Sequence, residues 1–421
     1  MAPVPDREPS LGLRANAGQF ALLVGVSALV GGMVGQERAI VPLLGVQVFG
    51  LPTATAALSF LIAFGLTKAV TNLVAGALAD RVGRKPVLVA GWLVGVPVPF
   101  LLIVAPDWGW VVVANVLLGV NQGLTWSTTV LMKIDLVGPR RRGLALGLNE
   151  ASGYLAVAVV AFLTGLIAQS AGLRPEPFFL GIAIAGLGLG VSVLFVRETH
   201  GHALHESRVA SGDGPAADHV PWRDLVWRST VSDPSLSAVS QAGLVNNLND
   251  AMAWGLLPLV WAAAGLGLAQ IVILAGVYPA VWGVTQVATG AWSDRVGRKR
   301  LIVAGMFVQA AAIAAIAATS GFVPWAVAAA ALGLGTAMVY TTLIAVVADV
   351  AEPRRGGAIT GIYRFWRDLG FAIGAILVGV LADRFDARVA ILAVAVLTAM
   401  SGLIVAVRLR ETRPVTPSTG G

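Results

Sequence analysis

The chain contains no cysteine, few charged residues and only four histidines. Without cysteine it can form no disulfide framework, no thiolate metal site and no cysteine nucleophile. Only 12% of its 421 residues are charged, roughly half the fraction found in soluble domains. No Gly-x-x-x-x-Gly-Lys-Ser/Thr string occurs, so ATP is not the expected energy source. No arrangement of nucleophile and base suggests catalysis, and we expect neither an enzyme nor a bound cofactor.

Apolar residues make up 57% of the chain, and the mean hydropathy is +0.81. Apolar runs of about 20 residues, long enough to span the hydrocarbon layer, fill most of it. The 50 glycines fit a membrane protein, because small residues let membrane helices pack closely. We therefore predict an all-α membrane protein with twelve transmembrane helices. The predicted helices are 17–43, 53–79, 86–105, 109–133, 143–170, 176–196, 235–263, 267–292, 301–319, 322–348, 357–381 and 388–407.

One six-residue string, Asp-Arg-Val-Gly-Arg-Lys, occurs at 80–85 and again at 294–299, an offset of 214 residues. Asp135 and Asp349 repeat at the same offset, as do the Pro-Arg-Arg strings that begin at 139 and 353. The chain is therefore predicted to contain two parallel six-helix bundles with one binding site between them. The expected organisation is a tail (1–16), an N-terminal bundle (17–197), a linker (198–234), a C-terminal bundle (235–408) and a second tail (409–421).

Most of the 29 basic residues flank the predicted helices on the side that also holds both termini and the linker. Basic residues accumulate on the cytoplasmic side of membrane proteins. We therefore expect a multi-pass protein of the cytoplasmic (inner) membrane with both termini in the cytoplasm. The net charge of +7 then reflects topology, and no nucleic acid partner is expected. The expected partners are the lipid bilayer and a small-molecule substrate, with the chain acting as a monomer.

All four histidines, His200, His202, His205 and His219, fall in the predicted linker. With neighbouring glutamates they could bind a transition metal as a sensor. A solvated linker is the simpler interpretation, and no resident metal is predicted. The linker ends at 221–228 in a mixture of aromatic and basic residues that is typical of an interfacial helix. That helix could act as a lateral strut or merely anchor the next membrane helix.

Both copies of the repeated string extend to Gly-x-x-x-Asp-Arg-x-Gly-Arg-Lys, and this pattern resembles the signature of the major facilitator superfamily between helices 2 and 3. The resemblance covers about residues 15 to 410. It implies a cytoplasmic gate in which Asp80 and Arg84 latch the two halves when that side is closed. The alternative is that these charges only fix topology. The expected gate residues are Gly76, Asp80, Arg81, Gly83, Arg84, Lys85, Gly290, Asp294, Arg295, Gly297, Arg298 and Lys299.

Eight charged residues fall inside predicted helices, and such residues usually mark function because burying a charge in hydrocarbon is costly. The candidates for proton coupling are Glu150, Asp250, Glu37 and Asp368. The basic candidates for a substrate cavity are Lys68, Arg364, Arg38 and Arg367. Equal numbers of acids and bases fit paired charges around a cavity between the halves.

The repeat offset aligns Glu150 with Arg364, so equivalent positions of the fifth and eleventh helices carry opposite charges. By similarity to the family these helices face the opposite bundle, and a Glu150–Arg364 ion pair across the cavity is one hypothesis. The alternative is a pair within one helix between Arg364 and Asp368, which stand four residues apart. Uncharged residues expected to complete the cavity are Asn121, Gln122, Trp126, Asn149, Tyr154, Asn246, Asn249, Trp254, Tyr278 and Trp366.

The resulting prediction is a secondary active transporter that moves a small solute by alternating access. Proton-coupled efflux is favoured by analogy with the family, with the proton gradient as energy source. Gly143 and Gly147 lack the following proline found in many drug–proton antiporters of the family, which argues against a specific assignment of drug export. The alternatives are a proton-coupled uptake symporter of an anionic or zwitterionic solute, an uncoupled facilitator, and a membrane sensor that does not transport.

Overall fold

The computed structural model describes residues 11–138, 142–211, 221–351 and 356–412, and this part of the chain contains helices and no strand. Every one of the twelve predicted segments is helical. Ten of the described helices are long and apolar enough to cross a membrane. The all-α membrane fold is therefore confirmed. The Pro-Arg-Arg strings and His219 lie outside the described residues.

The N-terminal half is interrupted where proline enters its helices. The first predicted helix ends at Arg38 and resumes at Val41, and the third is divided before Pro97, since proline lacks the N–H that would continue a helix. The N-terminal helices are α1 (Ala17–Arg38), α2 (Val41–Gln47), α3 (Ala54–Ala57), α4 (Ser59–Val82), α5 (Arg84–Gly95), α6 (Pro97–Val104), α7 (Trp108–Val137), α8 (Arg142–Ala171), η2 (Glu176–Phe178) and α9 (Phe179–Leu194).

The C-terminal half has longer helices and one local widening. The predicted segment 235–263 contains a π-helical turn, η4, just before Pro258, and this turn carries Trp254. Such turns are frequent at functional sites. The C-terminal helices are α12 (Pro234–Ala251), η4 (Met252–Leu256), α13 (Leu257–Ala263), α14 (Leu268–Val296), α15 (Arg298–Ala318), α16 (Phe322–Val350), α17 (Gly356–Arg384) and α18 (Ala387–Arg408).

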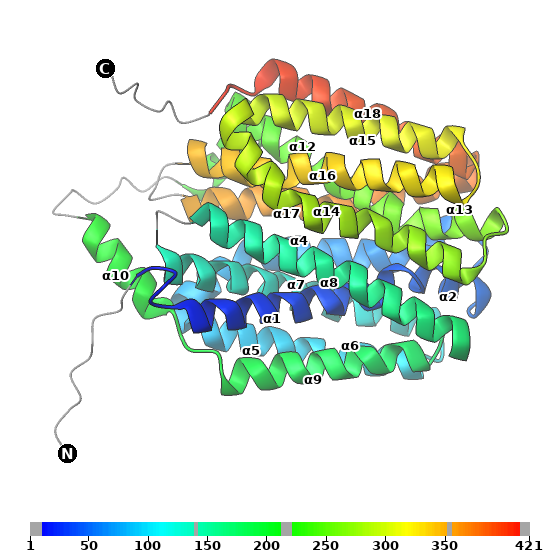
Figure 1. Ribbon diagram of the computed structural model, residues 1–421, viewed down its shortest axis with the longest axis horizontal. Coiled ribbons are helices and arrows are strands. Elements are labelled where there is room, and N and C mark those ends of the chain that lie inside the picture. The colour runs from blue at the N-terminus through cyan, green and yellow to red at the C-terminus, as the bar shows by residue number, and fades with distance from the viewer. Residues whose placement is uncertain (1–10, 139–141, 212–220, 352–355, 413–421) are drawn as a thin grey trace.

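The linker between the halves contains helices of its own. The predicted interfacial helix forms as α11 (Trp222–Trp227), followed by the π-helical turn η3 (Arg228–Ser232). Its two tryptophan side chains are exposed, Trp222 by 51% and Trp227 by 61%. The segment predicted as a solvated linker also contains a helix, α10 (His200–Ser211), which lies at one end of the molecule in Figure 1.

The internal repeat is visible in matching turns. α4 ends at Val82 and α14 at Val296, and each is followed by a glycine with a positive φ, 97° at Gly83 and 105° at Gly297. This conformation is strained for residues with a side chain, which explains the glycine in both copies of the string. We call the end of the molecule that holds these two turns the motif end, and the other the far end.

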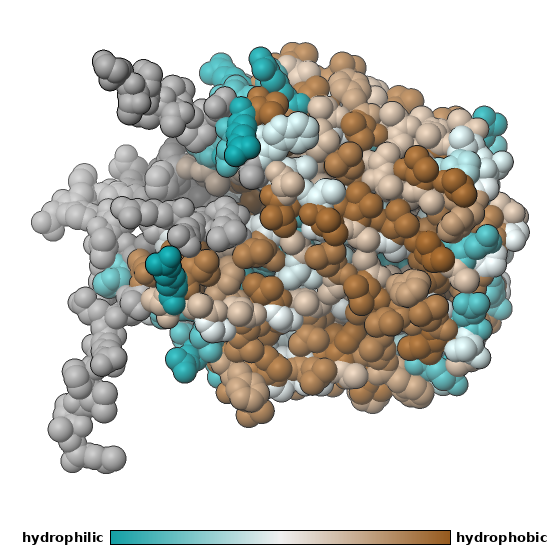
Figure 2. Space-filling view, in the orientation of Figure 1, coloured by the Kyte–Doolittle hydropathy of each residue, from teal (hydrophilic) through white to brown (hydrophobic). Residues whose placement is uncertain are grey.

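The two halves pack along an interface that we call the seam, formed mainly by α4 against α17 and α8 against α14. In Figure 1 the N-terminal half, blue to green, and the C-terminal half, green to red, lie beside each other with their long helices roughly parallel. Figure 2 shows hydrophobic side chains over the middle of the visible face and hydrophilic ones gathered towards its ends, as expected for a surface in contact with lipid.

The halves are closed at the far end. A Cβ added to Gly379 of α17 would lie 2.8 Å from the Cα of Thr55, and one added to Gly165 of α8 would lie 2.1 Å from Val272. The carboxylate of Asp383 accepts hydrogen bonds from the backbone N–H groups of Ala54 (2.6 Å) and Thr55 (3.0 Å). Close contacts at the glycines and the hydrogen bonds to Asp383 therefore join the N-terminal and C-terminal halves at the far end.

Towards the motif end the same helix faces lose their contacts. Gly361 and Gly147 stand about five helical turns from Gly379 and Gly165, which places them on the same faces. A Cβ at either position would meet no described atom within 4 Å, and the same holds for Gly76 and Gly290 of α4 and α14. The halves thus diverge towards the motif end, and we infer that the conformation is closed at the far end only.

This divergence predicts a difference in chemical accessibility, which the cysteine-free chain makes easy to measure. Cysteine in Gly361→Cys should react with a hydrophilic maleimide at least about ten times faster than cysteine in Ala372→Cys. Ala372 lies about three turns further along the same face of α17 and is buried against Gly65. Equal labelling rates in the two purified variants would contradict the divergence.

Candidate functional site

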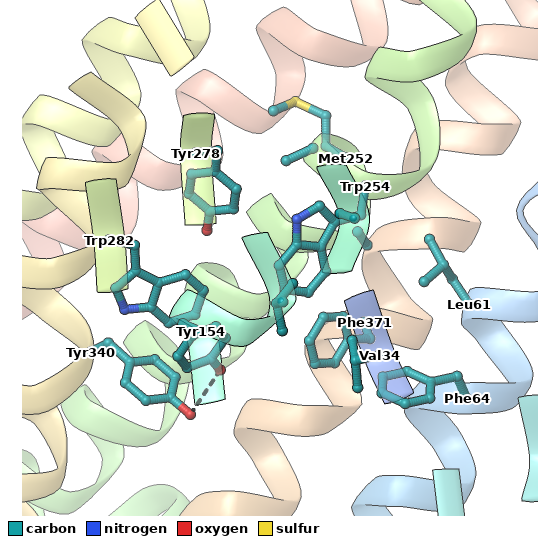
Figure 3. Close-up of a cluster of buried hydrophobic side chains, with 14 of the residues drawn as sticks. Val34, Leu61, Phe64, Tyr154, Met252, Trp254, Tyr278, Trp282, Tyr340 and Phe371 are labelled. Carbon is teal, nitrogen blue, oxygen red and sulfur yellow. Dashed lines mark hydrogen bonds between the residues drawn. The ribbon is translucent and has the colours of Figure 1, made fainter. Parts of the chain in front are cut away.

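Aromatic rings from both halves meet at the centre of the seam (Figure 3). Tyr154 of α8 stacks on Trp282 of α14 with ring centroids 3.5 Å apart, and its hydroxyl donates to Tyr340 at 3.1 Å. Phe371 of α17 lies 5.5 Å from Phe64 of α4 and is stacked 5.9 Å from Trp254. These rings are buried, and we expect them to provide the apolar walls of a binding site.

The most completely paired charge at the seam is Asp368 of α17. Arg367 donates to both of its oxygens, from Nε at 2.9 Å and from Nη2 at 3.0 Å. Lys68 of α4 stands 3.8 Å from one oxygen, and Asn247 of α12 donates to the same carboxylate at 3.1 Å. Asn72 of α4 also donates to it. Because α4 belongs to the other half, Asp368 ties the two bundles together.

Arg364 does not form either of the ion pairs considered for it. Its Nη1 donates to the hydroxyl of Ser127 at 3.1 Å, and Ser127 donates to Asn72 at 2.7 Å. The i, i+4 partner Asp368 is taken by Arg367, its neighbour in sequence. A chain of hydrogen bonds through Ser127 and Asn72 of the N-terminal half therefore connects Arg364 with Asp368, two residues of one helix.

Glu150 of α8 lies in a separate network. Its Oε1 accepts from the indole of Trp126 at 3.0 Å and from Asn149 at 3.1 Å, whereas its Oε2 is buried without a hydrogen-bond partner. Asn149 in turn accepts from Lys133 at 2.6 Å and from Ser27 at 2.9 Å. The hypothetical Glu150–Arg364 ion pair does not form in this conformation, since equivalent positions of two repeats need not face each other.

Lys133 is a buried charge that the predicted helix bounds place at a helix end. As the last residue of the predicted helix 109–133, it would belong to the basic residues on the cytoplasmic side. The structure extends α7 to Val137 and leaves Lys133 fully buried, bonded to Ser27 and Asn149. The burial of Lys133 could be predicted from the sequence only if the helix was predicted to continue beyond residue 133.

Asp250 stands at the end of α12, just before the π-helical turn. The hydroxyl of Tyr278 from α14 donates to its Oδ1, and Thr336 of α16 lies 3.4 Å from the same hydroxyl. The other oxygen, Oδ2, is buried without a partner. Asp250 thus has only half of its carboxylate satisfied, in contrast to Asp368.

Glu37 and Arg38 are the least satisfied of the buried charges. Both carboxylate oxygens of Glu37 and all three guanidinium nitrogens of Arg38 are buried without a hydrogen-bond partner. The guanidinium carbon lies 4.5 Å from the ring centroid of Phe64 and 5.0 Å from that of Trp254. Arg38 is therefore in contact with aromatic rings of both halves and with no acceptor in the described chain.

The expected cavity role of five polar residues is corrected by their partners, which place them in helix packing. In the N-terminal half, Asn121 donates to the carbonyl of Gly91, and Gln122 donates to that of Val30. The other three residues, with their partners in parentheses, are Asn246 (Gln309), Asn249 (Gln309 and Thr398) and Trp366 (Thr230 of η3). These contacts hold helices of one half together, or the linker against α17, and none of them reaches across the seam.

The two motif clusters at the motif end each stay within one half. Arg84 lies 2.5 Å from Asp80 and donates to Asp135 at 3.1 Å. In the second copy, Arg298 lies 3.2 Å from Asp294 and also pairs with Asp349. The latch between halves that the family resemblance implies is absent from this part of the described chain, in agreement with the divergence of the halves at this end.

A single carboxylate organises the first motif turn. Glu198 accepts backbone hydrogen bonds from Arg84, Lys85, Thr199 and His200 at 2.8–2.9 Å. Partial burial opposes its ionisation, but these four N–H groups outweigh burial and lower the pKa of Glu198. Glu411 accepts from Arg298 in the second half in the same manner.

We expect Glu198→Gln to destabilise the purified protein by about 1 kcal/mol at pH 7, the value of a typical helix cap. Because the folded pKa is lowered, the carboxylate stabilises the fold above its unfolded value of about 4.3 and loses this effect as pH falls through the folded pKa. Thermal unfolding should therefore separate the variant from the original by a larger margin at pH 7 than at pH 3. The exposed Asp224→Asn is the control, and a gap of equal size at both pH values would contradict this account.

Metal binding by the linker gains no support from the geometry. Within the described ranges no group of three or more histidine, cysteine or acidic side chains is arranged to hold a metal ion. His202 and His205 are close enough to influence each other, and partial burial together with His205 lowers the pKa of His202. His219, the fourth histidine of the hypothesis, lies outside the described residues.

Two repeated helical halves with charged groups buried at their interface define a membrane transporter. The family model described as Major Facilitator Superfamily matches residues 18–247 and 239–421. The chain belongs to this family, as the repeated string indicated, and it is accordingly a transporter rather than an enzyme.

Three curated proteins are similar to the chain at low identity. Multidrug resistance protein MdtG from Enterobacter lignolyticus is 23% identical over 344 residues, 80% of this chain and 78% of that protein. Probable anion transporter 5 from Arabidopsis thaliana is 26% identical over 176 residues, 38% of this chain and 40% of that protein. Multidrug resistance protein MdtL from Shewanella oneidensis is 25% identical over 144 residues, 34% of this chain and 36% of that protein. The chain thus spans less than half the length of two of these relatives.

Proposed function

We propose that the protein is a proton-coupled exporter that works as a monomer in the cytoplasmic membrane, with both termini and the motif end in the cytoplasm. The observation that carries the coupling is the set of buried carboxylate oxygens without partners in Glu150, Asp250 and Glu37. A buried charge without a partner costs several kcal/mol, and binding a proton removes that charge. These three carboxylates are the candidates for the proton.

Asp368 has a different role in this proposal. Its carboxylate is paired with Arg367 and Lys68 and receives amide donors from two further residues. These partners stabilise the charged form of the carboxylate, so protonation is not favoured. Asp368 instead holds the halves together. The proton-carrying role expected for Asp368 from the sequence is therefore replaced by a structural one.

The arrangement of the halves supports alternating access. The conformation is closed at the far end and divergent at the motif end, so a solute would reach the seam from the cytoplasm. Protonation of Asp250 or Glu150 changes the charge balance at the seam and biases the equilibrium between this state and one open at the far end. In that second state the Asp80–Arg84 cluster is free to latch the halves, as the family resemblance implies.

The proposed direction of transport rests on similarity to known proteins. MdtG matches over most of both chains and is named a multidrug resistance protein, which supports export. The partial match to an anion transporter supports the second candidate, a proton-coupled uptake symporter for an anionic or zwitterionic solute.

A growth and accumulation panel tests the proposal. Cells that express the protein are compared with cells that express Asp250→Asn, using labelled anionic, neutral and cationic compounds with and without a protonophore. If the protein is an exporter, cells that express it should accumulate less of at least one compound than cells with Asp250→Asn. The protonophore should abolish this difference. Higher accumulation would indicate uptake, and accumulation insensitive to both changes would contradict proton-coupled transport.

A further inference from the structure

The clearest unexplained group at the seam is the guanidinium of Arg38. It is fully buried in the last turn of α1, and its Nε, Nη1 and Nη2 have no hydrogen-bond partner. A guanidinium presents five N–H donors and remains charged in proteins, so leaving all of them unsatisfied is costly. Glu37 precedes it directly and Asp250 lies within electrostatic range, but neither carboxylate accepts a hydrogen bond from the guanidinium.

The surroundings of Arg38 offer aromatic faces in place of acceptors. Phe64 of α4 and Trp254 of η4 lie under the guanidinium, and Lys68 lies 5.4–5.5 Å from the rings of Phe64, Trp126 and Phe371. Cation–π contacts of this kind contribute about 0.5–2 kcal/mol. They are weaker than the paired contacts a guanidinium makes with a carboxylate or phosphate. Arg38 is thus held in place but not satisfied.

The charge balance of the seam favours an anion. Apart from Arg84, Asp135 and Arg298 of the motif clusters, the described buried charges comprise five cations and four anions. The cations are Arg38, Lys68, Lys133, Arg364 and Arg367, and the anions are Glu37, Glu150, Asp250 and Asp368. The set carries one excess positive charge when every member is ionised. Any proton taken up by a carboxylate increases that excess. A cationic solute would be repelled, whereas a single negative charge on the solute would neutralise the set.

We infer that the seam binds an organic anion, whose acidic group pairs with Arg38 while its planar apolar body lies among Phe64, Trp254 and Phe371. Figure 3 shows these three rings close together at the meeting point of α4, η4 and α17. Both halves contribute to the ring set, so a bound anion would contact both halves at once. This inference names the solute class and rests on the proposed transport function.

Binding to the purified full-length protein tests the inference without any flux. Titration calorimetry would compare three probes of one shape, 4-toluenesulfonate (anion), 4-toluenesulfonamide (neutral) and 4-methylbenzylamine (cation). We expect the anion to bind at least about tenfold more tightly than the other two, a difference of about 1.4 kcal/mol. Equal affinities, or no binding of the anion, would overturn the inference whether or not any variant folds.

Variants locate the site. Arg38→Gln should weaken binding of 4-toluenesulfonate at least about tenfold and leave the neutral probe unaffected, and Arg38→Lys should restore part of the loss. Arg174→Gln is the matched control, because Arg174 also lies over a ring, Phe49 at 5.2 Å, but at the far end away from the seam. Unchanged anion affinity in Arg38→Gln, or an equal loss in Arg174→Gln, would contradict the assignment.

The outcomes separate this inference from the proposed function. Anion-selective binding through Arg38 without proton-driven flux would uphold the solute class and reject the exporter. Proton-driven flux of neutral or cationic compounds that is insensitive to Arg38→Gln would uphold the exporter and reject the solute class.

Discussion

Asp250→Asn should abolish proton-driven export while leaving exchange of labelled for unlabelled solute intact. Asparagine has nearly the same shape as aspartate and can still accept the hydrogen bond from Tyr278, but it cannot take up a proton. Export driven by a proton gradient should fall at least about tenfold, the change expected when about 1.4 kcal/mol of coupling is lost. The assay is solute movement into everted membrane vesicles at matched expression.

Two further variants complete this experiment. Glu150→Gln should behave in the same way if both carboxylates take part, and Asp224→Asn, an exposed residue of the linker, should have no effect. Full proton-driven export in both Asp250→Asn and Glu150→Gln would reject the proposed coupling mechanism. A loss of both exchange and export would indicate a damaged fold. The thermal unfolding of each variant shows whether its fold is intact.

Asp368→Asn should be the most destabilising substitution at the seam. Removing one partner of a buried ion pair leaves its cations uncompensated, at a cost of about 3–5 kcal/mol. Here the cations are Arg367 and Lys68, and the lost carboxylate also accepts donors from Asn72 and Asn247. The thermal midpoint of the protein in detergent should therefore fall by several degrees.

The double variant Arg367→Gln/Asp368→Asn provides the control for this effect. Because it removes one cation together with the anion, it should recover part of the stability lost in Asp368→Asn. If Asp368 were not paired with Arg367, the double variant would be no more stable than Asp368→Asn. A thermal midpoint for Asp368→Asn equal to that of the original protein would contradict the structural role given to this residue.

The architecture was predictable because its signals are strong and local. A run of apolar residues long enough to span the membrane is unambiguous, and the repeated string fixed the relation between the halves. Breaks at Pro97 and before Pro258 were missed because apolarity alone does not detect a local irregularity within a span.

The site was predicted less completely, for a physical reason. Helices inside a bundle are buried on several sides, so a polar residue can face a neighbour in its own half or the opposite half. Asn121 and Asn149 both appeared to be cavity residues, yet Asn121 bonds to α5 and Asn149 to the Glu150 network. Helical spacing pointed to Arg364, four residues away, as the partner of Asp368 within α17, whereas its main partner is the adjacent Arg367.

The most direct test of the account is whether solute entry moves protons. Everted vesicles that contain the protein are acidified inside by respiration, and a pH-sensitive dye follows the lumen when 4-toluenesulfonate or a compound selected by the accumulation panel is added. Proton-coupled export predicts that solute entry releases protons from the lumen with the original protein and not with Asp250→Asn. Solute entry without proton release, or equal release in both, would contradict the account.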